Sequence, residues 1–242
     1  TLSSSSAASD VYKRQELQDE ASQLVSWLVA PKPRETIIDY CAGAGGKSLH
    51  LSQLMRNRGS VVSCDINAYR LDQMKPRLKR AGCDNVRLHA FASEQEDGLD
   101  EFIGKADAVL VDAPCSGTGT YRRNPDLKWR ELDLNELNRL QLSILTAASK
   151  HVKPNGRLVY ATCSVLPCEN EAIIDAFLAA NPQFAKAPPE ASYENSLEIL
   201  AAIKAVDGES STLLSEFGTL RLHPHKHNTD GFFAQRMVCK PV

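Results

Sequence analysis

Short apolar runs alternate with stretches of helical periodicity along most of the chain. The runs are rich in β-branched residues and predict buried strands at 36–42, 61–65, 86–91, 106–113 and 157–164. Between these runs, and once after the last, apolar side chains recur at helical spacing and predict helices at 47–57, 67–81, 97–103, 134–152 and 168–180. This order is typical of parallel βαβ units with right-handed crossovers.

The first residues lack any such pattern. Residues 1–15 are rich in serine and alanine, so we expect a disordered, tag-like or artefactual segment and exclude it from the fold. A helix is predicted directly afterwards, where Leu24, Leu28 and Val29 form an apolar stripe before two prolines. We therefore expect one folded domain over residues 16–242.

The C-terminal part predicts an antiparallel hairpin. Apolar runs at about 217–223 and 231–238 flank a polar turn, and we expect this hairpin to close one sheet edge. Residues 185–213 predict no regular element. An interior proline costs about 3 kcal/mol in a helix, so the helix at 67–81 should kink or restart at Pro76. The fold predicted is α/β, with a Rossmann-like, doubly wound, mostly parallel sheet of seven strands.

Composition narrows the class of protein. A hydrophobic content of 43% without any run near the ~18 apolar residues of a membrane span argues against a membrane protein. Seven cysteines, an odd number, and no signal-peptide pattern predict free thiols and a cytoplasmic location. The formal net charge of −2 excludes a uniformly basic surface, so any contact with nucleic acid must be local.

A glycine-rich loop at 41–48 follows the first predicted strand and opens a helix. Glycines allow a sharp turn there, and the helix N-terminus offers free N–H groups to a ligand. Three interpretations remain open. A P-loop would need glycine in place of Cys41, a dinucleotide fingerprint would need glycine in place of Ser48, and a turn that only packs well needs neither.

The second predicted strand ends in Asp65, about 20 residues after the loop, where a carboxylate can accept hydrogen bonds from ribose hydroxyls. This spacing favours a ribose-bearing cofactor over a nucleoside triphosphate. Capping of the next helix is the alternative role for Asp65.

Two cysteines follow neighbouring predicted strands. Cys115 lies in DAPCSG after the fourth strand and Cys163 in ATCS after the fifth. Neighbouring strands lie about 4.8 Å apart and ligands bind at their carboxyl ends, so both thiols should face one pocket. The remaining cysteines outside the glycine loop fit the ordinary role of small buried side chains, namely Cys64, Cys83, Cys168 and Cys239.

Together these segments resemble the RsmB/Nol1/NSUN family of RNA 5-methylcytosine methyltransferases. DYCAGAGGKS, VDAPCSGTGTYRRNPDLKWR, LVYATCSVLPCENE and TDGFF match the family motifs in order and spacing across about residues 16–242, most closely those of bacterial 16S ribosomal RNA members. The resemblance implies the class I S-adenosylmethionine-dependent methyltransferase fold, S-adenosyl-L-methionine as cofactor and RNA as partner. Ribosomal RNA is expected over transfer RNA, in a single-stranded or loosened segment, bound by a monomer without a metal.

The resemblance also assigns catalytic roles. Cys163 would add to C6 of cytosine and activate C5 for methylation, and Cys115 would help release the product as a base or through a water molecule. Asp112 would hold N3 of the base beside the cofactor. An ordinary thiol is only about 3% ionised at neutral pH, so the pocket should supply positive or hydrogen-bonding surroundings.

For the cofactor, the resemblance implies binding by Asp65, Asp112 and the glycine-rich loop, whose residues are Cys41, Ala42, Gly43, Ala44, Gly45, Gly46 and Lys47. Relatives commonly carry an acid after the third strand to hold the adenine amino group, whereas this chain has HAFA at 89–92. Either a neighbour or backbone replaces that contact, or cofactor affinity is weakened.

A basic and aromatic segment at 121–130 follows the second motif and predicts RNA contacts through Arg122, Arg123, Lys128 and Trp129. A solvated charged loop is the alternative. Three alternating histidines lack the further ligands of a metal site, so we predict no metal; they are His223, His225 and His227.

Relatives usually carry further N-terminal RNA-binding structure, and we expect it to be absent from this chain. Two rival functions remain. One is a non-catalytic RNA-binding or ribosome-assembly module of the same fold, favoured by the missing acid and the weak net charge. The other is a P-loop NTPase.

Overall fold

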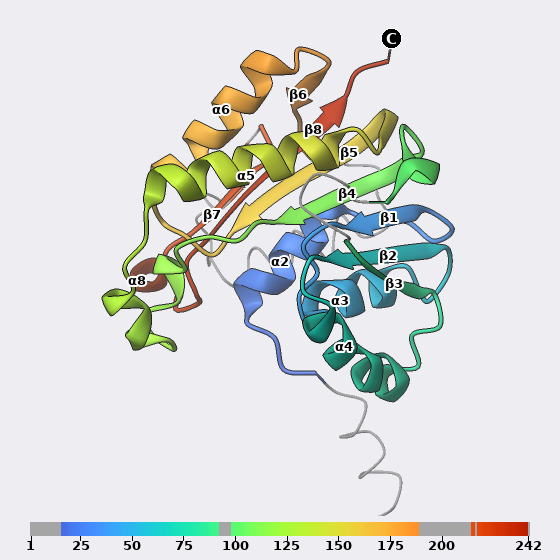
Figure 1. The fold of residues 1–242 in the computed structure, drawn as a ribbon, viewed down its shortest axis with the longest axis horizontal. Helices are drawn as coiled ribbons and strands as arrows, with labels where there is room; N and C mark the ends of the chain where they lie inside the picture. The colour runs from blue at the N-terminus through green and yellow to red at the C-terminus, as the bar shows by residue number, and fades with distance from the viewer. Residues whose placement is uncertain (1–15, 92–97, 189–213, 216, 242) are drawn as a thin grey trace, which may run out of the picture.

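The computed structural model describes residues 16–91, 98–188, 214–215 and 217–241. Within them one sheet of eight strands has the order β3-β2-β1-β4-β5-β8-β6, with β7 also paired to β8 (Figure 1). The strands are β1 Thr36–Asp39, β2 Ser60–Asp65, β3 Val86–Ala90, β4 Ala106–Asp112, β5 Val152–Thr162, β6 Phe184–Lys186, β7 Thr219–Leu222 and β8 Phe232–Cys239.

Helices and short turns connect these strands. The α-helices are α2 Glu20–Val29, α3 Gly46–Leu54, α4 Ala68–Ala81, α5 Leu134–Ser149, α6 Glu171–Ala180 and α8 Pro224–His227. The 3-10 turns are η1 Asp100–Phe102, η2 Thr118–Thr120, η3 Pro125–Trp129 and η4 Pro167–Glu169.

The sheet separates two apolar cores, because alternate residues of each strand point to opposite faces. Ile37 of β1 packs with α2 and α3 on one face, and Ile38 packs with α5 and α6 on the other (Figure 1). Strands β1 to β5 pair in parallel, so the predicted doubly wound α/β fold is confirmed. The strand order turns back between β1 and β4, and this switch point is where such folds bind ligands.

The predicted C-terminal hairpin forms at one edge of the sheet. β7 and β8 pair in antiparallel register. β8 pairs with β5 on one side, and on its other side with β7 at residues 232–235 and with the unpredicted β6 at residues 237–239. The apolar run of β8 is buried along most of its length, which suits an interior strand better than an edge. The described sheet thus has one strand more than predicted.

Two predicted helices also differ. The helix expected at 97–103 is only the 3-10 turn Asp100–Phe102 among its described residues. Helix α4 continues through Pro76, so it does not restart there. Pro76 and Asp72, whose carbonyl loses its helical partner, are both exposed, while Leu71 and Met74 anchor the opposite face. The predicted disordered segment at 1–15 and most of 185–213 lie outside the described residues.

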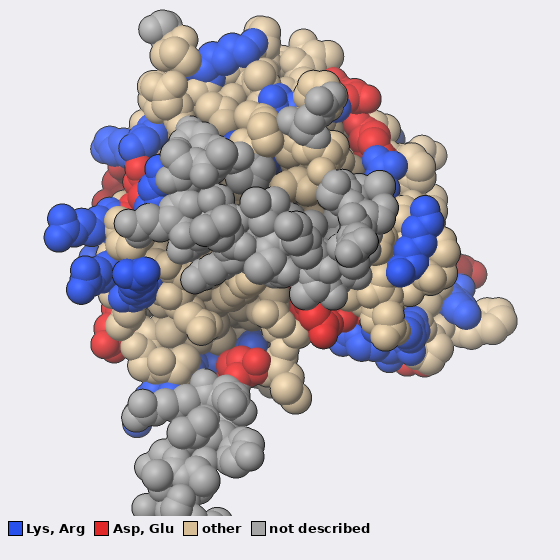
Figure 2. Space-filling view, turned by 180° about the vertical axis from the view of Figure 1, so that it is seen from behind, with Lys and Arg blue, Asp and Glu red and all other residues tan. Residues whose placement is uncertain are grey.

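Within the described ranges, no helix is long and apolar enough to cross a membrane. In the rear view of Figure 2, the described Lys and Arg side chains stand in separate groups near the outline of the molecule, with Asp and Glu among them. The described residues of that face therefore form no continuous basic surface, in keeping with the net charge of −2.

Candidate active site

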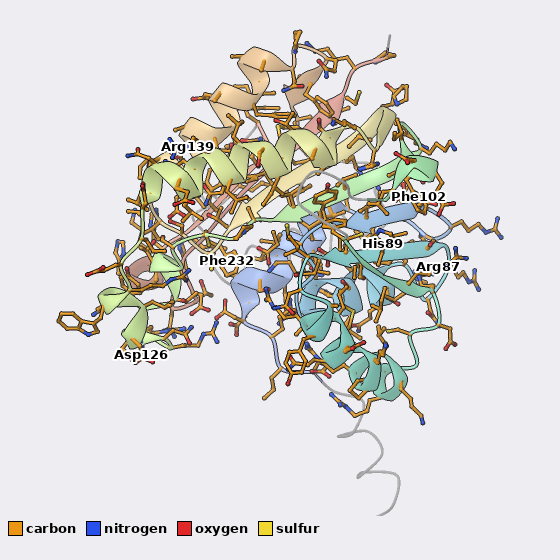
Figure 3. The ribbon with its side chains drawn as sticks, viewed as in Figure 1. Arg87, His89, Phe102, Asp126, Arg139 and Phe232 are labelled. Atoms are coloured by element: carbon orange, nitrogen blue, oxygen red, sulfur yellow. The ribbon has the colours of Figure 1, made fainter. Side chains whose placement is uncertain are left out.

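A cavity of about 490 Å³ lies at the carboxyl ends of the central strands. Each of the main sequence motifs contributes to its wall, together with apolar side chains of α5 and Phe232 at the start of β8. Phe232 is labelled in Figure 3. The predicted site residues that line it are Cys41, Ala42, Asp65, Asp112, Cys115 and Cys163. Segments far apart in the sequence thus meet in one pocket.

The two predicted cysteines face each other in this cavity. β4 and β5 pair in parallel up to Asp112 and Ala161, so the residues that follow emerge side by side. The Sγ atoms of Cys115 and Cys163 are 3.3 Å apart, within hydrogen-bonding distance for sulfur. The prediction that both thiols face one pocket is confirmed.

The surroundings make the two thiols unequal. The pKa of Cys163 is lowered, chiefly by its hydrogen bond with Cys115; burial and Asp112 oppose this effect, and Lys47 supports it. The same hydrogen bond, together with burial, raises the pKa of Cys115 well above its ordinary value. These opposite directions, with Lys47 acting on Cys163, favour Cys163 over Cys115 as the thiolate of the pair.

Lys47 is almost completely buried, and its charge acts on the thiol of Cys163. Its Nζ is 2.7 Å from Oδ2 of Asp112 and 5.1 Å from the ring centre of Phe232. Burial acts to lower the pKa of Lys47, but the ion pair with Asp112 outweighs it, so the pKa is raised. Lys47 is thus a fixed positive charge that neutralises Asp112. Because a P-loop lysine must reach phosphate groups, this pairing argues against the NTPase alternative.

The glycine-rich loop turns sharply around helix α4. Gly43 and Gly45 adopt φ of +56° and +86°, and a Cβ on either would strike the side chain of Arg70 or Met74. The turn and its packing therefore already require glycine at both positions. The interpretation of the loop as a packing turn stays open on this evidence alone.

Asp65 joins the glycine-rich loop to the end of β2. Its Oδ2 accepts a hydrogen bond from the Gly43 backbone N–H and its Oδ1 one from the Asn67 N–H, both at 2.8 Å. The cap of α4 is Asn67, whose side chain accepts from Arg70 N. Asp65 is therefore not the helix cap that the alternative interpretation required, and its carboxylate borders the cavity.

Apolar side chains surround the part of the cavity next to Asp65. Ile66 is 54% exposed and Phe91 packs on Tyr40 with ring centres 4.7 Å apart. The carboxylates among the described lining residues are Asp65 and Asp112. The departure noted at the end of the third strand is thus not compensated by another described acid in the cavity wall.

Of the four predicted RNA-binding residues, Arg123 forms an ion pair with a buried carboxylate, whereas Arg122, Lys128 and Trp129 lie on the surface. Arg123 donates to both carboxylate oxygens of Asp230, which is fully buried, so it ties the TDGFF segment to the loop after Cys115. Arg122 donates to the Asn228 carbonyl at 3.0 Å, on the surface. Trp129 is 87% exposed. Sequence reasoning did not identify the Asp230 partner of Arg123, because that pair is distant in sequence.

The three alternating histidines lie together around α8. The His223 ring centre is 5.6 Å from that of His225 and 6.4 Å from that of His227. The described residues contain no group of three or more potential ligands arranged to hold a metal ion.

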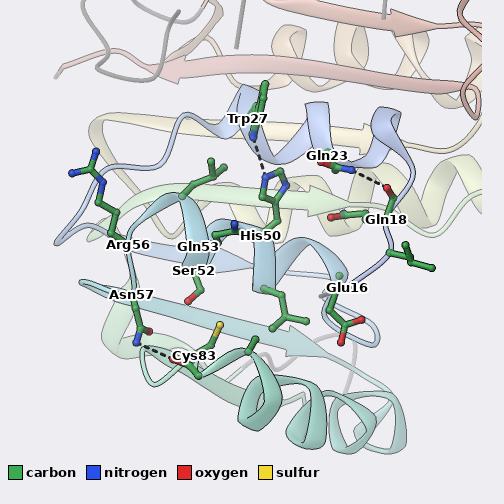
Figure 4. Close-up of a pocket in the computed structure, with 16 residues that line it drawn as sticks. Glu16, Gln18, Gln23, Trp27, His50, Ser52, Gln53, Arg56, Asn57 and Cys83 are labelled. Atoms are coloured by element: carbon green, nitrogen blue, oxygen red, sulfur yellow. Dashed lines mark hydrogen bonds between the residues drawn. The ribbon is translucent and has the colours of Figure 1, made fainter. Parts of the chain in front are cut away.

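A second cavity, of about 1030 Å³, lies between α2, α3 and the end of α4 (Figure 4). Trp27 Nε1 donates to His50 Nε2 at 2.9 Å, and burial lowers the pKa of His50 to about 4. Of the predicted site residues, only Gly46 is among its described lining residues. Although larger, this cavity holds one cysteine, Cys83, and one carboxylate, Glu16, among its described lining residues, and Glu16 is paired with Arg77 and Arg80.

One buried residue of the candidate site was missed. Glu169, in the LPCENE motif, is fully buried and accepts hydrogen bonds from the residue after each reactive cysteine. Its place in a motif that carried the resemblance was the only signal in the sequence, since a glutamate near a helix start is usually a solvated residue.

Comparison with known proteins places this geometry in a family. Residues 26–238 match the family described as 16S rRNA methyltransferase RsmB/F. The probable ribosomal RNA small subunit methyltransferase B of Bacillus subtilis (strain 168) is 38% identical over 220 residues, which cover 90% of this chain and 46% of that protein. The chain thus spans about half the length of the curated relatives it matches.

Solved structures agree. PH0851 is 36% identical with a TM-score of 0.78, covering 96% of this chain and 48% of that one. NSun6 from Pyrococcus horikoshii, crystallised with SFG, is 27% identical with a TM-score of 0.75, covering 100% of this chain and 57% of that one. The match over most of the chain, in both sequence and fold, shows that this chain belongs to the RsmB/F family of 16S rRNA methyltransferases.

Proposed function

We propose that this chain transfers a methyl group from S-adenosyl-L-methionine to C5 of a cytosine in RNA, through a covalent bond between Cys163 and C6. The observation that carries the proposal is the pair of thiols 3.3 Å apart at the end of β4 and β5, with the pKa of Cys163 lowered. Relatives named ribosomal RNA small subunit methyltransferase B favour ribosomal RNA as the substrate and the cytoplasm as the place of action.

The residues of the cavity fit the proposed methyl donor. NSun6 was crystallised with SFG, an analogue of S-adenosylmethionine, which supports the same cofactor here. Asp65 offers a carboxylate for ribose hydroxyls, and Ile66 and Phe91 offer apolar contacts for an adenine ring. When bound, the cofactor supplies a methyl group on a positively charged sulfur. We propose that the loop at 41–47 holds it against Asp112.

Cys163 begins the reaction as a thiolate. Its attack on C6 pushes electrons toward C5 and N3, and C5 then becomes nucleophilic enough to accept a methyl group. Asp112, whose Oδ2 lies 2.7 Å from Lys47 Nζ, can accept a hydrogen bond from the amino group beside N3, and the positive charge of Lys47 offsets the electrons that collect at N3. The buried Lys47 therefore serves both the thiolate and the carboxylate.

Cys115 completes the reaction. After methylation the C5 proton must leave and the C6–S bond must break, with the electrons returning to the sulfur of Cys163. Once Cys163 is bound to C6 it carries no negative charge, and this removes one cause of the raised pKa of Cys115. Cys115 can then ionise and take the C5 proton, directly or through a water molecule.

RNA contacts are proposed at the rim of the pocket. Trp129, 87% exposed, suits stacking on an unpaired base, while Arg122 and Lys128 suit phosphate contacts. Arg123 would act by holding the neighbouring segment through Asp230 rather than by touching RNA.

The proposal is tested by trapping the covalent intermediate. RNA containing 5-fluorocytosine has no C5 proton to release, so wild-type protein with cofactor should form a denaturation-resistant adduct. Cys163→Ala should form none. Cys115→Ala should accumulate an adduct with ordinary RNA, and Cys239→Ala is the matched control. If Cys115→Ala instead abolishes the adduct and Cys163→Ala accumulates it, the assigned roles are reversed.

The non-catalytic alternative makes a different prediction. An RNA-binding or assembly module of this fold would bind RNA yet transfer no radiolabelled methyl group from the donor. Absence of both transfer and adduct, in protein that binds the donor by calorimetry, would favour that alternative.

A further inference from the structure

Glu169 connects the two cysteine loops from the interior. The residue is fully buried. Its Oε1 accepts hydrogen bonds from Ser116 N at 2.8 Å and Gln141 Nε2 at 2.9 Å. Its Oε2 accepts from Ser116 Oγ at 2.5 Å and from Ser164 Oγ. Ser116 follows Cys115 and Ser164 follows Cys163, so one carboxylate is bonded to the residue after each reactive cysteine.

Glu169 is itself held in place. Tyr160 OH donates to its backbone carbonyl at 2.7 Å, from within β5. Gln141 of α5 donates both to Glu169 and to the Pro114 carbonyl at 3.0 Å, just before Cys115. The carboxylate is thus anchored to a strand and a helix, and it transmits their positions to both loops.

The neighbouring Asn170 contacts only one of the two cysteine loops through the hydrogen bonds of its side chain. Its Nδ2 donates to the Ser164 carbonyl at 3.0 Å, and its Oδ1 accepts from Thr162 Oγ1 at 2.6 Å. Both contacts flank Cys163, whereas Glu169 also reaches the Cys115 loop. Asn170 therefore orients one cysteine, and Glu169 links the two.

The fold alone does not call for a carboxylate at this point. Among the described residues, the partners of Glu169 are hydroxyl and amide groups, and its carboxylate makes no ion pair with Lys or Arg. Burying a carboxylate without a cation is unfavourable, and an apolar side chain would fill the same space at a lower cost in folding free energy. What the carboxylate adds is three directed acceptor contacts to the two loops and a fourth to Gln141 of α5.

We propose that Glu169 is a positioning residue that sets the separation between Cys115 and Cys163, an inference that rests on the proposed function of that pair. The two sulfurs must alternate as nucleophile and proton acceptor on adjacent atoms of one base. A misplacement of about 1 Å in such an arrangement lowers the rate about a hundredfold.

The first experiment measures the two thiols without RNA or methyl donor. Oxidised glutathione forms a mixed disulfide with one cysteine and releases glutathione; the second cysteine displaces another glutathione and closes the Cys115–Cys163 disulfide. The rate at which the Cys115–Cys163 disulfide closes, here called the coupling rate, is followed by mass spectrometry. It should fall at least about tenfold in Glu169→Ala. Glu171→Ala, the same change at a surface glutamate paired with Arg221, is the matched control.

Two further variants keep the test decisive if Glu169→Ala folds poorly. Glu169→Gln retains the acceptor for Ser116 N and can donate from its amide to both serine hydroxyls, so its coupling rate should approach wild type. Ser164→Ala removes the bond between Glu169 and the Cys163 loop, together with the contacts of that hydroxyl with Ser116, Thr118 and Leu166 N, and should slow coupling, unlike Ser149→Ala on α5. Wild-type coupling rates in folded Glu169→Ala and Ser164→Ala, or no rescue by Glu169→Gln, would overturn the proposal.

The second experiment uses RNA. Glu169→Ala should lower kcat about a hundredfold, leave KM for RNA within about twofold, and accumulate the covalent adduct as Cys115→Ala does. A purely stabilising role would change the melting temperature without such an adduct. If wild-type protein shows no transfer, the proposed function fails, while the disulfide experiment still decides the role of Glu169.

Discussion

The Arg123–Asp230 ion pair gives a quantitative test of how the loops around the pocket are joined. Asp230 is fully buried, and Arg123 Nε lies 3.0 and 2.8 Å from its carboxylate oxygens. Removing one partner of a buried pair costs about 3–5 kcal/mol. Since the Arg123 side chain is 55% exposed and water can reach it, we expect Arg123→Ala to lose about 3 kcal/mol, the lower limit.

This loss is measurable by calorimetry. A destabilisation of 1 kcal/mol lowers the melting temperature of a chain of this size by about 2–4 °C, so Arg123→Ala should melt about 6–12 °C lower. Arg122→Ala removes the same charge from a surface contact with Asn228 and should change stability by less than about 1 kcal/mol. Adding Asp230→Asn to Arg123→Ala should recover part of the loss, because no unpaired buried charge remains.

A melting temperature of Arg123→Ala within about 2 °C of wild type would refute this reasoning. It would mean that Asp230 is solvated in solution and that Arg123 is available to RNA. The salt dependence of RNA binding provides the complementary readout, since it should weaken in Arg122→Ala and stay unchanged in Arg123→Ala.

Three further predictions follow from the site and its surroundings. Lys47→Met should raise the pKa of Cys163, so alkylation of Cys163 by iodoacetamide should need higher pH; an unchanged pH profile contradicts the role of Lys47. The pKa of His50 is lowered to about 4 by burial, so its contribution to stability is complete above about pH 6.5 and is lost as the pH falls through 4. Chemical denaturation across this range should show that loss in wild type and a smaller one in His50→Gln. Trp129→Ala should weaken RNA binding by about 1–3 kcal/mol without lowering the melting temperature, and a filter-binding titration with unchanged affinity would exclude Trp129 from the RNA surface.

Periodicity located the parallel core well, because its strands are continuous apolar runs separated by amphipathic helices. It failed where pairing depends on distant partners. β6 is only Phe184–Lys186, too short to give a pattern, and it exists because β8 offers it a free edge. The pairing of β8 with both β5 and β6 could not be foreseen from the hairpin alone, since a strand sequence does not specify its second neighbour.

The candidate site was predictable to the extent that motifs lie at strand ends. Cys115 and Cys163 follow adjacent parallel strands, so topology alone brings them together. The partners that tune them were not predictable. Lys47 was expected to serve the cofactor loop, but its side chain donates to Asp112, a residue 65 positions later in the sequence. Glu169 stands beside Asn170 and Glu171, and nothing in that polar run marks it as buried.

The position of β8 beside three other strands delays their pairing during synthesis. Ribosomes release the N-terminal end first, and long-range pairing of strands is slow to form. β5, β6 and β7 all pair with β8, which follows them in the sequence, so none of them gains that partner until residues 232–239 have been synthesised. Phe232, which borders the cavity, arrives with it. A chain that stops before residues 232–239 therefore lacks a finished pocket.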